Sequence, residues 1–332
     1  MLTVGLIGAG RIGRVHASTI VQDEGSQLVA VADSVDENAK NLAKLYKVNP
    51  RSVDAIFEDN SIEAILIASS TDTHSDFIEK ASKAGKAILC EKPVDLSLAR
   101  AKRCLENTKS NEHSIMMGFN RRFDPNFVAL KNALDGGEIG TAELLSITSF
   151  DPAPPPIDYV KVSGGIFKDM MIHDFDMANF LYGELPKSVF VSASAIIDKK
   201  IGALGDYDTA VATLKYRDGR LAVIKNSRRA TYGYDQRIEV LGSKGLLQVQ
   251  NMVENSMVKS TEMGVESSKP EYFFLERYKS AYQNEWTAFV TALKTKTPMP
   301  VSLSDGIAAL AIAEAAAASA EMGSEVEIAN FL

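Results

Sequence analysis

The chain has 332 residues, of which 45% are hydrophobic and 24% charged, as in ordinary soluble globular proteins. This length favours two domains. The formal net charge of -7 argues against a nucleic-acid backbone as the main partner, because the phosphates would be repelled. Two cysteines provide no disulfide framework and indicate a reducing compartment, so we expect a cytoplasmic protein.

No membrane segment or metal site is expected from the sequence. The N-terminus is typical of a strand that enters a glycine turn, not of a signal peptide. The longest apolar run, Gly306 to Ala320, carries Glu314 and is too short to span a bilayer. The four histidines and two cysteines do not show the spacing of metal ligands.

The start of the chain carries a nucleotide-binding pattern. An apolar strand leads into a G-x-G-x-x-G turn, a helical pattern follows, and a second strand ends in Asp33. Together these form the dinucleotide-binding fingerprint, in which the glycines let the pyrophosphate approach a helix N-terminus. Asp33 would bind the ribose hydroxyls and repel a 2′-phosphate, which favours NAD over NADP; a plain glycine turn is the alternative. The predicted cofactor contacts here are Gly8, Gly10, Arg11, Ile12, Gly13, Asp33 and Ser34.

Strands and helices keep alternating up to residue 120. Helices are predicted at Asp36–Tyr46, Ser75–Ala84 and Leu96–Thr108, and strands at Ala64–Ala68, Ala87–Cys90 and Ser114–Gly118. This order predicts a Rossmann domain, an α/β fold with a doubly wound parallel sheet, over residues 1–120. Its ligand should lie at the carboxyl ends of the strands. The polar residues there that we predict to contact the cofactor are Ser69, Thr71, His74, Glu91 and Lys92.

From residue 121 the pattern becomes α+β. Strands are predicted at Glu143–Ser149, Ser188–Ala195, Asp208–Tyr216, Leu221–Asn226, Gln236–Leu241 and Leu246–Gln250. Asp218-Gly219 between two of them is a hairpin signal. Helices at Tyr278–Lys294 and Ser304–Met322 close the chain. We therefore expect residues 121–332 to form a substrate-binding and oligomerisation domain with a large, mostly antiparallel open sheet, whose last helices could pack back on the Rossmann domain.

The polar stretch after Gly164-Gly165 is the candidate location of the catalytic residues. Asp169, His173 and Asp176 stand at i, i+4 and i+7, so in a helix they would share one face. A histidine can accept a proton near neutral pH, and a carboxylate one turn earlier can orient its ring. The alternative is a helix with an ordinary solvated polar face. The residues predicted to form the opposite, apolar side are Met171, Phe175 and Ala178.

In combination, these motifs resemble the Gfo/Idh/MocA oxidoreductase family over nearly the whole chain. The resemblance rests on the glycine turn, Glu91-Lys92-Pro93, the G-G-x-x-x-D-x-x-x-H-D stretch, and residues 118–125 and 232–237. It implies an NAD-dependent enzyme that oxidises one secondary hydroxyl of a cyclic polyol to a ketone, with myo-inositol as the first expectation. It also implies a homotetramer built through the open face of the C-terminal sheet.

The resemblance assigns the chemistry to Lys92, Asp169 and His173. Oxidation sends a hydride to nicotinamide C4 and removes a hydroxyl proton, for which His173 is the candidate base, oriented by Asp169. Lys92 would hold the substrate oxygen and stabilise alkoxide charge or relay the proton, and a cis bond to Pro93 would fit the family. The substrate-binding positions carried over are Lys92, Arg121, Asp151, Asp169, His173, Asp176, Tyr232 and Tyr234.

Several alternatives remain open. Arg121 could cap a loop instead of binding substrate. Tyr232 and Tyr234 would face the same way on a strand, which suits a pocket wall, a sheet face or an interface equally. Phe150 stands where similar family members often carry a polar or basic residue, which leaves the substrate open: scyllo-inositol or a pyranose such as glucose or L-glucose. A nucleotide-binding protein without turnover is the alternative from another class.

Overall fold

The computed structural model describes residues 1–332, which pack as two compact units. The first unit comprises residues 1–123 and 280–310, and the second comprises residues 124–279 and 311–332. The prediction set the domain boundary at residue 120 and allowed the last helices to pack back on the Rossmann domain. In the structure both units are discontinuous, because the chain returns to the first unit after residue 279.

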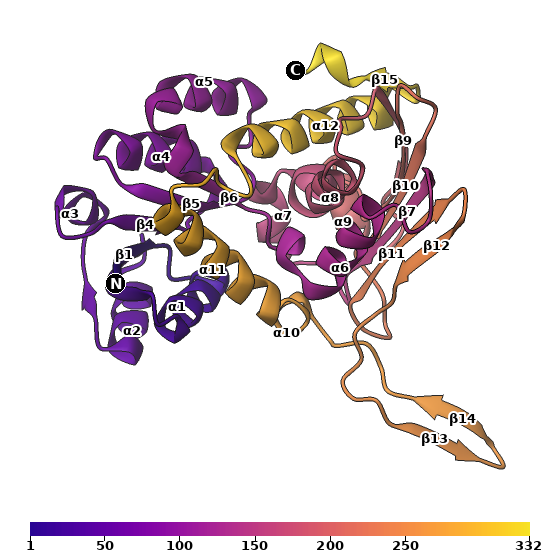
Figure 1. Ribbon diagram of the computed structural model, residues 1–332, viewed down its shortest axis with the longest axis horizontal. Coiled ribbons are helices and arrows are strands. Elements are labelled where there is room, and N and C mark those ends of the chain that lie inside the picture. Colours follow the sequence, from indigo (N-terminus) through magenta and orange to yellow (C-terminus); the bar gives the residue numbers. More distant parts are fainter. The chain divides into compact units, whose positions relative to one another are not determined.

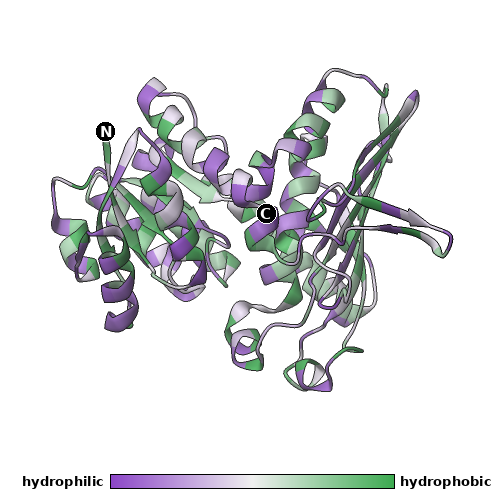
Figure 2. Cartoon of the chain, turned by 90° about the horizontal axis from the view of Figure 1, so that it is seen from below, coloured by the Kyte–Doolittle hydropathy of each residue, from purple (hydrophilic) through white to green (hydrophobic).

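The first unit is built on a parallel sheet, as predicted, but it has six strands because β3 joins the five predicted ones; the strand order is β3-β2-β1-β4-β5-β6. The strand order reverses between the neighbours β1 and β4, and ligands bind at such a reversal in doubly wound folds. The central strands are apolar because both of their faces are covered, and Figure 2 shows this hydrophobic interior. The strands are β1 (Leu2–Ile7), β2 (Ser26–Ala32), β3 (Asn49–Pro50), β4 (Ala64–Ile67), β5 (Ala87–Glu91) and β6 (Ile115–Gly118).

Helices surround this sheet in the predicted order (Figure 1). The predicted ones are α1 (Arg11–Gln22), α2 (Asp36–Tyr46), α4 (His74–Lys83), α5 (Leu98–Thr108) and α11 (Lys279–Thr295). On α11, fully buried Trp286 donates from Nε1 to Ser26 Oγ at 2.9 Å and is a core residue of this unit. The short helices that the sequence analysis missed are α3 (Val53–Glu58), η1 (Thr71–Thr73), η2 (Lys109–Ser114) and η3 (Asn120–Phe123).

The second unit is built on a seven-stranded sheet with the order β12-β11-β7-β10-β9-β8-β15. Only β7 and β10 pair in parallel, so the sheet is mostly antiparallel, as predicted. The strands are β7 (Ala142–Phe150), β8 (Ser188–Ser194), β9 (Thr209–Lys215), β10 (Leu221–Ser227), β11 (Asp235–Gly242), β12 (Gly245–Val249) and β15 (Val326–Glu327). Helices cover one face of this sheet (Figure 1).

The helices of this unit are mostly short. They are α6 (Pro125–Asp135), α7 (Ile157–Ser163), a π-helical turn η4 (Phe167–Met171), α8 (Ile172–Tyr182), α9 (Lys199–Ala203), α10 (Phe274–Arg277) and η5 (Ile328–Asn330). A separate hairpin of β13 (Val258–Thr261) and β14 (Gly264–Ser267) projects from the unit and was not predicted. Of these helices, only α8 was expected from the sequence. The 11-residue α6 was missed, and the remaining helices are too short to show a clear hydrophobic period.

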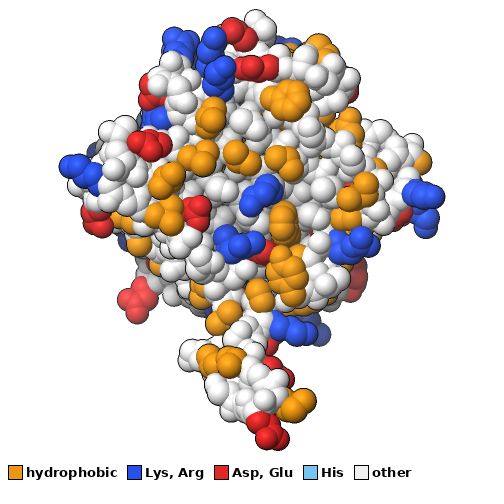
Figure 3. All heavy atoms as spheres, turned by 90° about the vertical axis from the view of Figure 1, so that its right-hand side faces the viewer, with side chains coloured by type: hydrophobic (Ala, Val, Ile, Leu, Met, Phe, Trp, Pro, Cys, Tyr) orange, Lys and Arg blue, Asp and Glu red, His pale blue; other side chains and the backbone are white.

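The other face of the seven-stranded sheet is open (Figure 3). The strand register places six large apolar side chains on this face, and each is between 37% and 46% exposed. They are Leu144, Phe190, Val211, Leu221, Leu241 and Leu246. Apolar side chains gathered on one surface in this way are typical of a contact region.

Helix α12 (Leu303–Met322) corrects one expectation. It has 20 residues, so the view that its apolar run is too short to cross a bilayer is wrong. However, 61% of its most apolar window is buried inside the protein, as in a core helix. Within this helix, Glu314 Oε1 forms an ion pair with Lys168 Nζ at 3.2 Å.

Candidate active site

The glycine turn after β1 has the shape that a dinucleotide needs. Gly8 has a φ of 104°, and a Cβ there would come 2.3 Å from Ala68 O. A Cβ at Gly13 would come 1.9 Å from Gly8 O, so the turn itself requires both glycines. A Cβ at Gly10 would meet nothing within 4 Å. The protein's own packing does not require that glycine, and the open space at the start of α1 fits the close approach of a pyrophosphate.

The N-terminus of α1 is suited to an anion. Gly10 caps it without a side chain, and no acidic residue lies in the first turn. The N–H groups of the first turn and the positive end of the helix dipole therefore suit a phosphate. Beside the turn, Asp33 accepts from Ala9 N at 2.6 Å and from Val35 N at 2.8 Å, which ties the end of β2 to the glycine loop. Arg11 and Ser34 are exposed, and Ile12 is half-buried.

His74 has a structural role that the sequence analysis did not specify. Its fully buried ring bonds to Pro93 O at 2.7 Å and to Ser69 O at 3.2 Å. Burial lowers the pKa of this histidine. The ring thus joins the loop after β4 to the turn after β5. The cofactor contacts assigned to His74, to half-buried Ser69 and to Thr71 in η1 stay predictions.

Lys92 stands half-buried at the carboxyl end of β5, and its bond to Pro93 is cis, as the resemblance implied. Buried Glu91 supports it: Glu91 Oε2 accepts from Lys92 N at 3.3 Å, while Oε1 bonds to His16 Nε2 at 2.7 Å. Both oxygens of Glu91 thus have protein partners, and its predicted contact with the cofactor stays a prediction. Arg121, 4% exposed, lies in η3 of the same unit.

In the second unit, a glycine turn in the left-handed backbone region starts the polar stretch. Gly164 and Gly165 have φ values of 84° and 78°, which residues with a Cβ rarely adopt. Asp206 Oδ1 accepts from Ile166 N at 2.9 Å and so caps the following turn. A Cβ on Gly165 would lie 2.7 Å from this oxygen. The second glycine therefore makes room for the cap as well as for the turn.

The polar stretch is not one regular α-helix, which corrects our expectation. The π-helical turn η4 contains Asp169, while His173 and Asp176 lie one turn apart on α8. The wider turn removes the 3.6-residue period on which the shared face of all three side chains was based. Single π turns are rare and recur at functional sites. The predicted apolar side is confirmed, since Met171, Phe175 and Ala178 are each 0% exposed.

Asp169 is held by two side chains of its own unit. Tyr159 Oη donates to its Oδ1 at 2.8 Å, and Arg228 Nη1 lies 3.6 Å from its Oδ2. The Asp169 side chain is 15% exposed and Asp176 is 1% exposed. The alternative of an ordinary solvated helix face is therefore wrong. That Asp169 orients His173 stays a prediction.

Asp174 is an anchor that the sequence analysis missed. It is fully buried and accepts from Ser149 Oγ at 2.5 Å and from Asn226 Nδ2 at 2.8 Å. These partners sit opposite each other on β7 and β10. Asp174 thereby ties the first turn of α8 to the sheet and fixes the backbone of its neighbour His173. The available signal was a second acid, directly next to the histidine, in a mostly apolar helix.

The two tyrosines do not share a strand face, contrary to expectation. Gly233 between them has a φ of 132°, which breaks the extended alternation before β11 begins. Tyr234 is 5% exposed, and its ring packs against Tyr278 with centroids 6.0 Å apart. Tyr232 is 46% exposed and donates to Asp235 Oδ2 at 2.5 Å. Their roles as substrate contacts stay predictions.

Asp151 follows β7 and is held through its backbone. Its N–H donates to Ser227 O at 2.9 Å, and its carbonyl accepts from Ala230 N at 2.6 Å. Phe150 before it pairs with the ends of β10 and β11. These backbone contacts fix the position of half-buried Asp151. Its contact with substrate stays a prediction.

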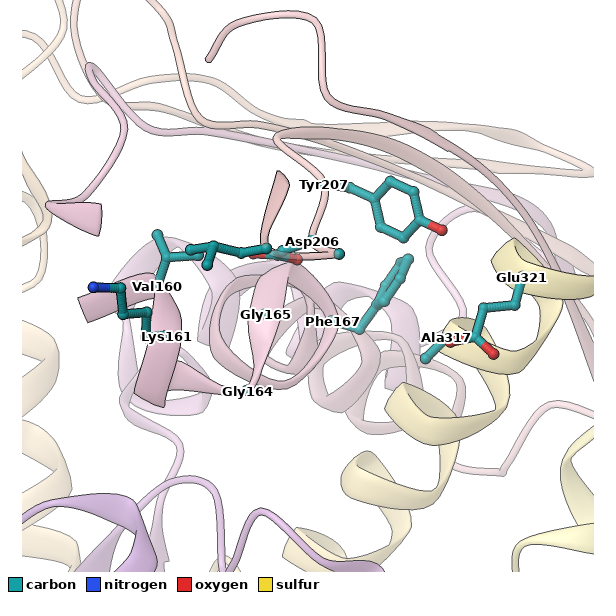
Figure 4. Close-up of a pocket in the computed structure, with 11 residues that line it drawn as sticks. Val160, Lys161, Gly164, Gly165, Phe167, Asp206, Tyr207, Ala317 and Glu321 are labelled. Carbon is teal, nitrogen blue, oxygen red and sulfur yellow. The ribbon is translucent and has the colours of Figure 1, made fainter. Parts of the chain in front are cut away.

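A pocket of about 350 Å³ lies in the second unit, beside the glycine turn (Figure 4). Gly164, Gly165 and Asp206 form part of its wall, and the rings of Phe167 and Tyr207 meet there at 5.9 Å. None of the predicted catalytic or substrate-binding side chains lines it. The pocket is therefore separate from the predicted site.

Comparison with known proteins identifies both parts of the chain. Residues 2–119 match the oxidoreductase family with an NAD-binding Rossmann fold, and residues 127–248 match the GFO/IDH/MocA C-terminal domain. An inositol 2-dehydrogenase of Rhizobium meliloti (strain 1021) is 48% identical over 98% of both chains.

Solved structures agree over nearly the full length. The structure of a myo-inositol dehydrogenase from Corynebacterium glutamicum ATCC 13032 superposes with a TM-score of 0.95 at 40% identity and covers 98% of both chains. A scyllo-inositol dehydrogenase from Lactobacillus casei, with bound NAD(H) and scyllo-inositol, superposes with a TM-score of 0.92 at 27% identity and covers 99% of both chains. With its open glycine turn and this similarity, the chain belongs to the Gfo/Idh/MocA family and is an NAD-dependent oxidoreductase.

Proposed function

We propose that this protein is an inositol 2-dehydrogenase that oxidises myo-inositol to the ketone 2-keto-myo-inositol with NAD. The observation that carries the proposal is the presence of Lys92, Asp169 and His173 in a chain 48% identical to an inositol 2-dehydrogenase. The surrounding structure fixes two of these residues. Lys92 directly follows a parallel strand, and the carboxylate of Asp169 contacts two side chains.

In the proposed reaction, bound NAD supplies the hydride acceptor. His173 takes the hydroxyl proton, and its backbone is already fixed through the buried carboxylate of Asp174. Lys92 stabilises the developing alkoxide or relays the proton. Asp176 and Arg121 are almost fully buried polar side chains that suit a polyol, whose hydroxyls each need a partner in a closed site.

A second candidate substrate is scyllo-inositol, or a pyranose such as glucose or L-glucose. The similarity to a scyllo-inositol dehydrogenase and the apolar Phe150 at the end of β7 favour this alternative. The earlier alternative of a binding protein without turnover conflicts with the family assignment and with the complete set of Lys92, Asp169 and His173.

A panel of inositols and sugars with NAD, followed by the ultraviolet absorbance of NADH, tests these candidates through kcat/KM. Lys92→Ala should lower turnover about 10²- to 10⁴-fold while NAD still binds. Lys83→Ala, an exposed lysine at the end of α4, is the matched control and should leave turnover unchanged. Unchanged turnover in Lys92→Ala would remove Lys92 from the mechanism. If no compound in the panel reduces NAD, both proposed substrate classes are wrong.

We also propose a cytoplasmic homotetramer. The six exposed apolar side chains on the open sheet face support self-association, because a patch of this kind is favourably buried between copies. Both cysteines are free and buried, which is consistent with a reducing compartment. No nucleic-acid or membrane partner is part of the proposal.

A further inference from the structure

A buried arginine lies between two carboxylates beside the π-helical turn. Arg228 follows β10 and its side chain is 1% exposed. Nη1 lies 3.6 Å from Asp169 Oδ2, and Nη2 lies 3.7 Å from Asp206 Oδ2. Nε and Nη2 have no hydrogen-bond partner. At these distances the guanidinium acts as a shared positive charge between the carboxylates more than as a direct hydrogen-bond donor.

Such an arrangement is poorly explained by stability alone. Removing a guanidinium from water is unfavourable unless the charge is well paired and its donors are satisfied. A buried ion pair is often no better for stability than apolar residues of similar volume. Arg228 is buried with two donor atoms unsatisfied, so a local role for its charge is the better explanation.

Asp206 fixes the far end of this network. Its Oδ1 accepts from Ile166 N at 2.9 Å, and Gly165 leaves the space for it. Figure 4 shows Asp206 next to the glycine turn. The same turn begins the segment that carries Asp169. The chain therefore closes a loop of contacts from Gly165 through Asp206 and Arg228 to Asp169.

We infer that Arg228 is a positioning residue, which holds the Asp169 carboxylate in place and is itself held by Asp206. This inference deepens the proposed function, since it explains how the orienting carboxylate is kept in place. Tyr159 contacts the other oxygen of Asp169 but is 47% exposed, so its bond competes with water. Arg228 supplies the buried contact.

Arg228→Gln tests the inference most directly. Because a carboxylate displaced by about 1 Å can slow a reaction roughly 10²-fold, we expect kcat to fall about 10- to 100-fold. NAD affinity should not change, because the fingerprint lies in the other unit. Arg228→Lys keeps the charge and should recover part of kcat. Arg229→Gln, the exposed neighbour, is the matched control and should stay within about twofold of the wild type.

A double-mutant cycle separates positioning from a general loss of structure. In an Asp169→Asn background, Arg228→Gln should change kcat by no more than about twofold, because the residue acts through that carboxylate. Additive losses would overturn the inference. If Arg228→Gln does not fold, Asp206→Asn takes its place, since the amide oxygen can still cap Ile166 while the charge beside Arg228 is lost. A kcat within about twofold of the wild type in Asp206→Asn would also overturn it.

A readout without substrate keeps this inference distinct from the proposed function. The four histidines permit assignment of the His173 ring signal by NMR, with His173→Gln as the reference. The signal should move in Arg228→Gln and stay in Arg229→Gln. An unmoved signal in Arg228→Gln overturns the positioning role. Failure of wild-type protein to oxidise any inositol instead overturns only the proposed substrate.

Discussion

Replacing Gly165 with alanine should reduce both stability and turnover. Its φ of 78° lies in the left-handed region, which costs a residue with a Cβ roughly 1–2 kcal/mol. A lower entropy of the unfolded chain offsets about 0.4–1 kcal/mol of this. The new Cβ would also lie 2.7 Å from Asp206 Oδ1, so the carboxylate must move away. The lost bond to Ile166 N contributes about a further 0.5–1.5 kcal/mol.

Gly183 provides a matched control. It ends α8 with a φ of 71°, and a Cβ there would meet nothing within 4 Å. Gly183→Ala therefore carries the backbone penalty without the contact. The difference between the two variants measures the Asp206 cap alone, and we expect about 1 kcal/mol.

Urea unfolding and steady-state kinetics, run side by side on both variants, provide the assay. Gly183→Ala should be mildly less stable with normal kcat. Gly165→Ala should be less stable still, with kcat reduced about tenfold because Asp206 no longer holds Arg228 and Asp169 in place. Equal stability and equal kcat in the two variants would refute the reasoning.

Three further outcomes are expected. Asp33→Ala should weaken NAD binding and relax discrimination against NADP; an unchanged ratio of the two dissociation constants would contradict the role of Asp33. Burial and the nearby charge of Glu91 raise the pKa of Glu285 well above its ordinary value, so the native state loses stability as pH rises above about 4.5. Glu285→Gln should therefore raise Tm at about pH 8, with the gain vanishing near pH 4.5; a gain independent of pH would exclude this cause. Leu241→Glu on the open sheet face should reduce the mass seen by light scattering, whereas Val265→Glu on the β14 arm should not; an unchanged mass in Leu241→Glu would exclude that face as the interface.

The local features of this protein were readable from its sequence because they depend on neighbouring residues. The parallel strands appeared as continuous apolar runs, since a strand covered on both faces has no polar side. The glycine turn was recognisable because its glycines are closely spaced, and Gly13 is required by a contact with Gly8 O inside the turn itself. Short helices and the β13–β14 hairpin escaped notice because a few residues carry no complete period.

Only the tertiary structure decided how the candidate catalytic residues are supported. Asp206 lies 40 residues from the N–H group that it caps, and Asp174 bonds to strands 25 and 52 residues away. No spacing rule reports such partners, because they meet through sheet register. The π-helical turn at Asp169 and the break at Gly233 arise in the same way, since long-range packing overrides the local period. The sequence alone therefore determined the cofactor turn and the residue types for the chemistry, whereas tertiary packing determined which side chains hold them in place.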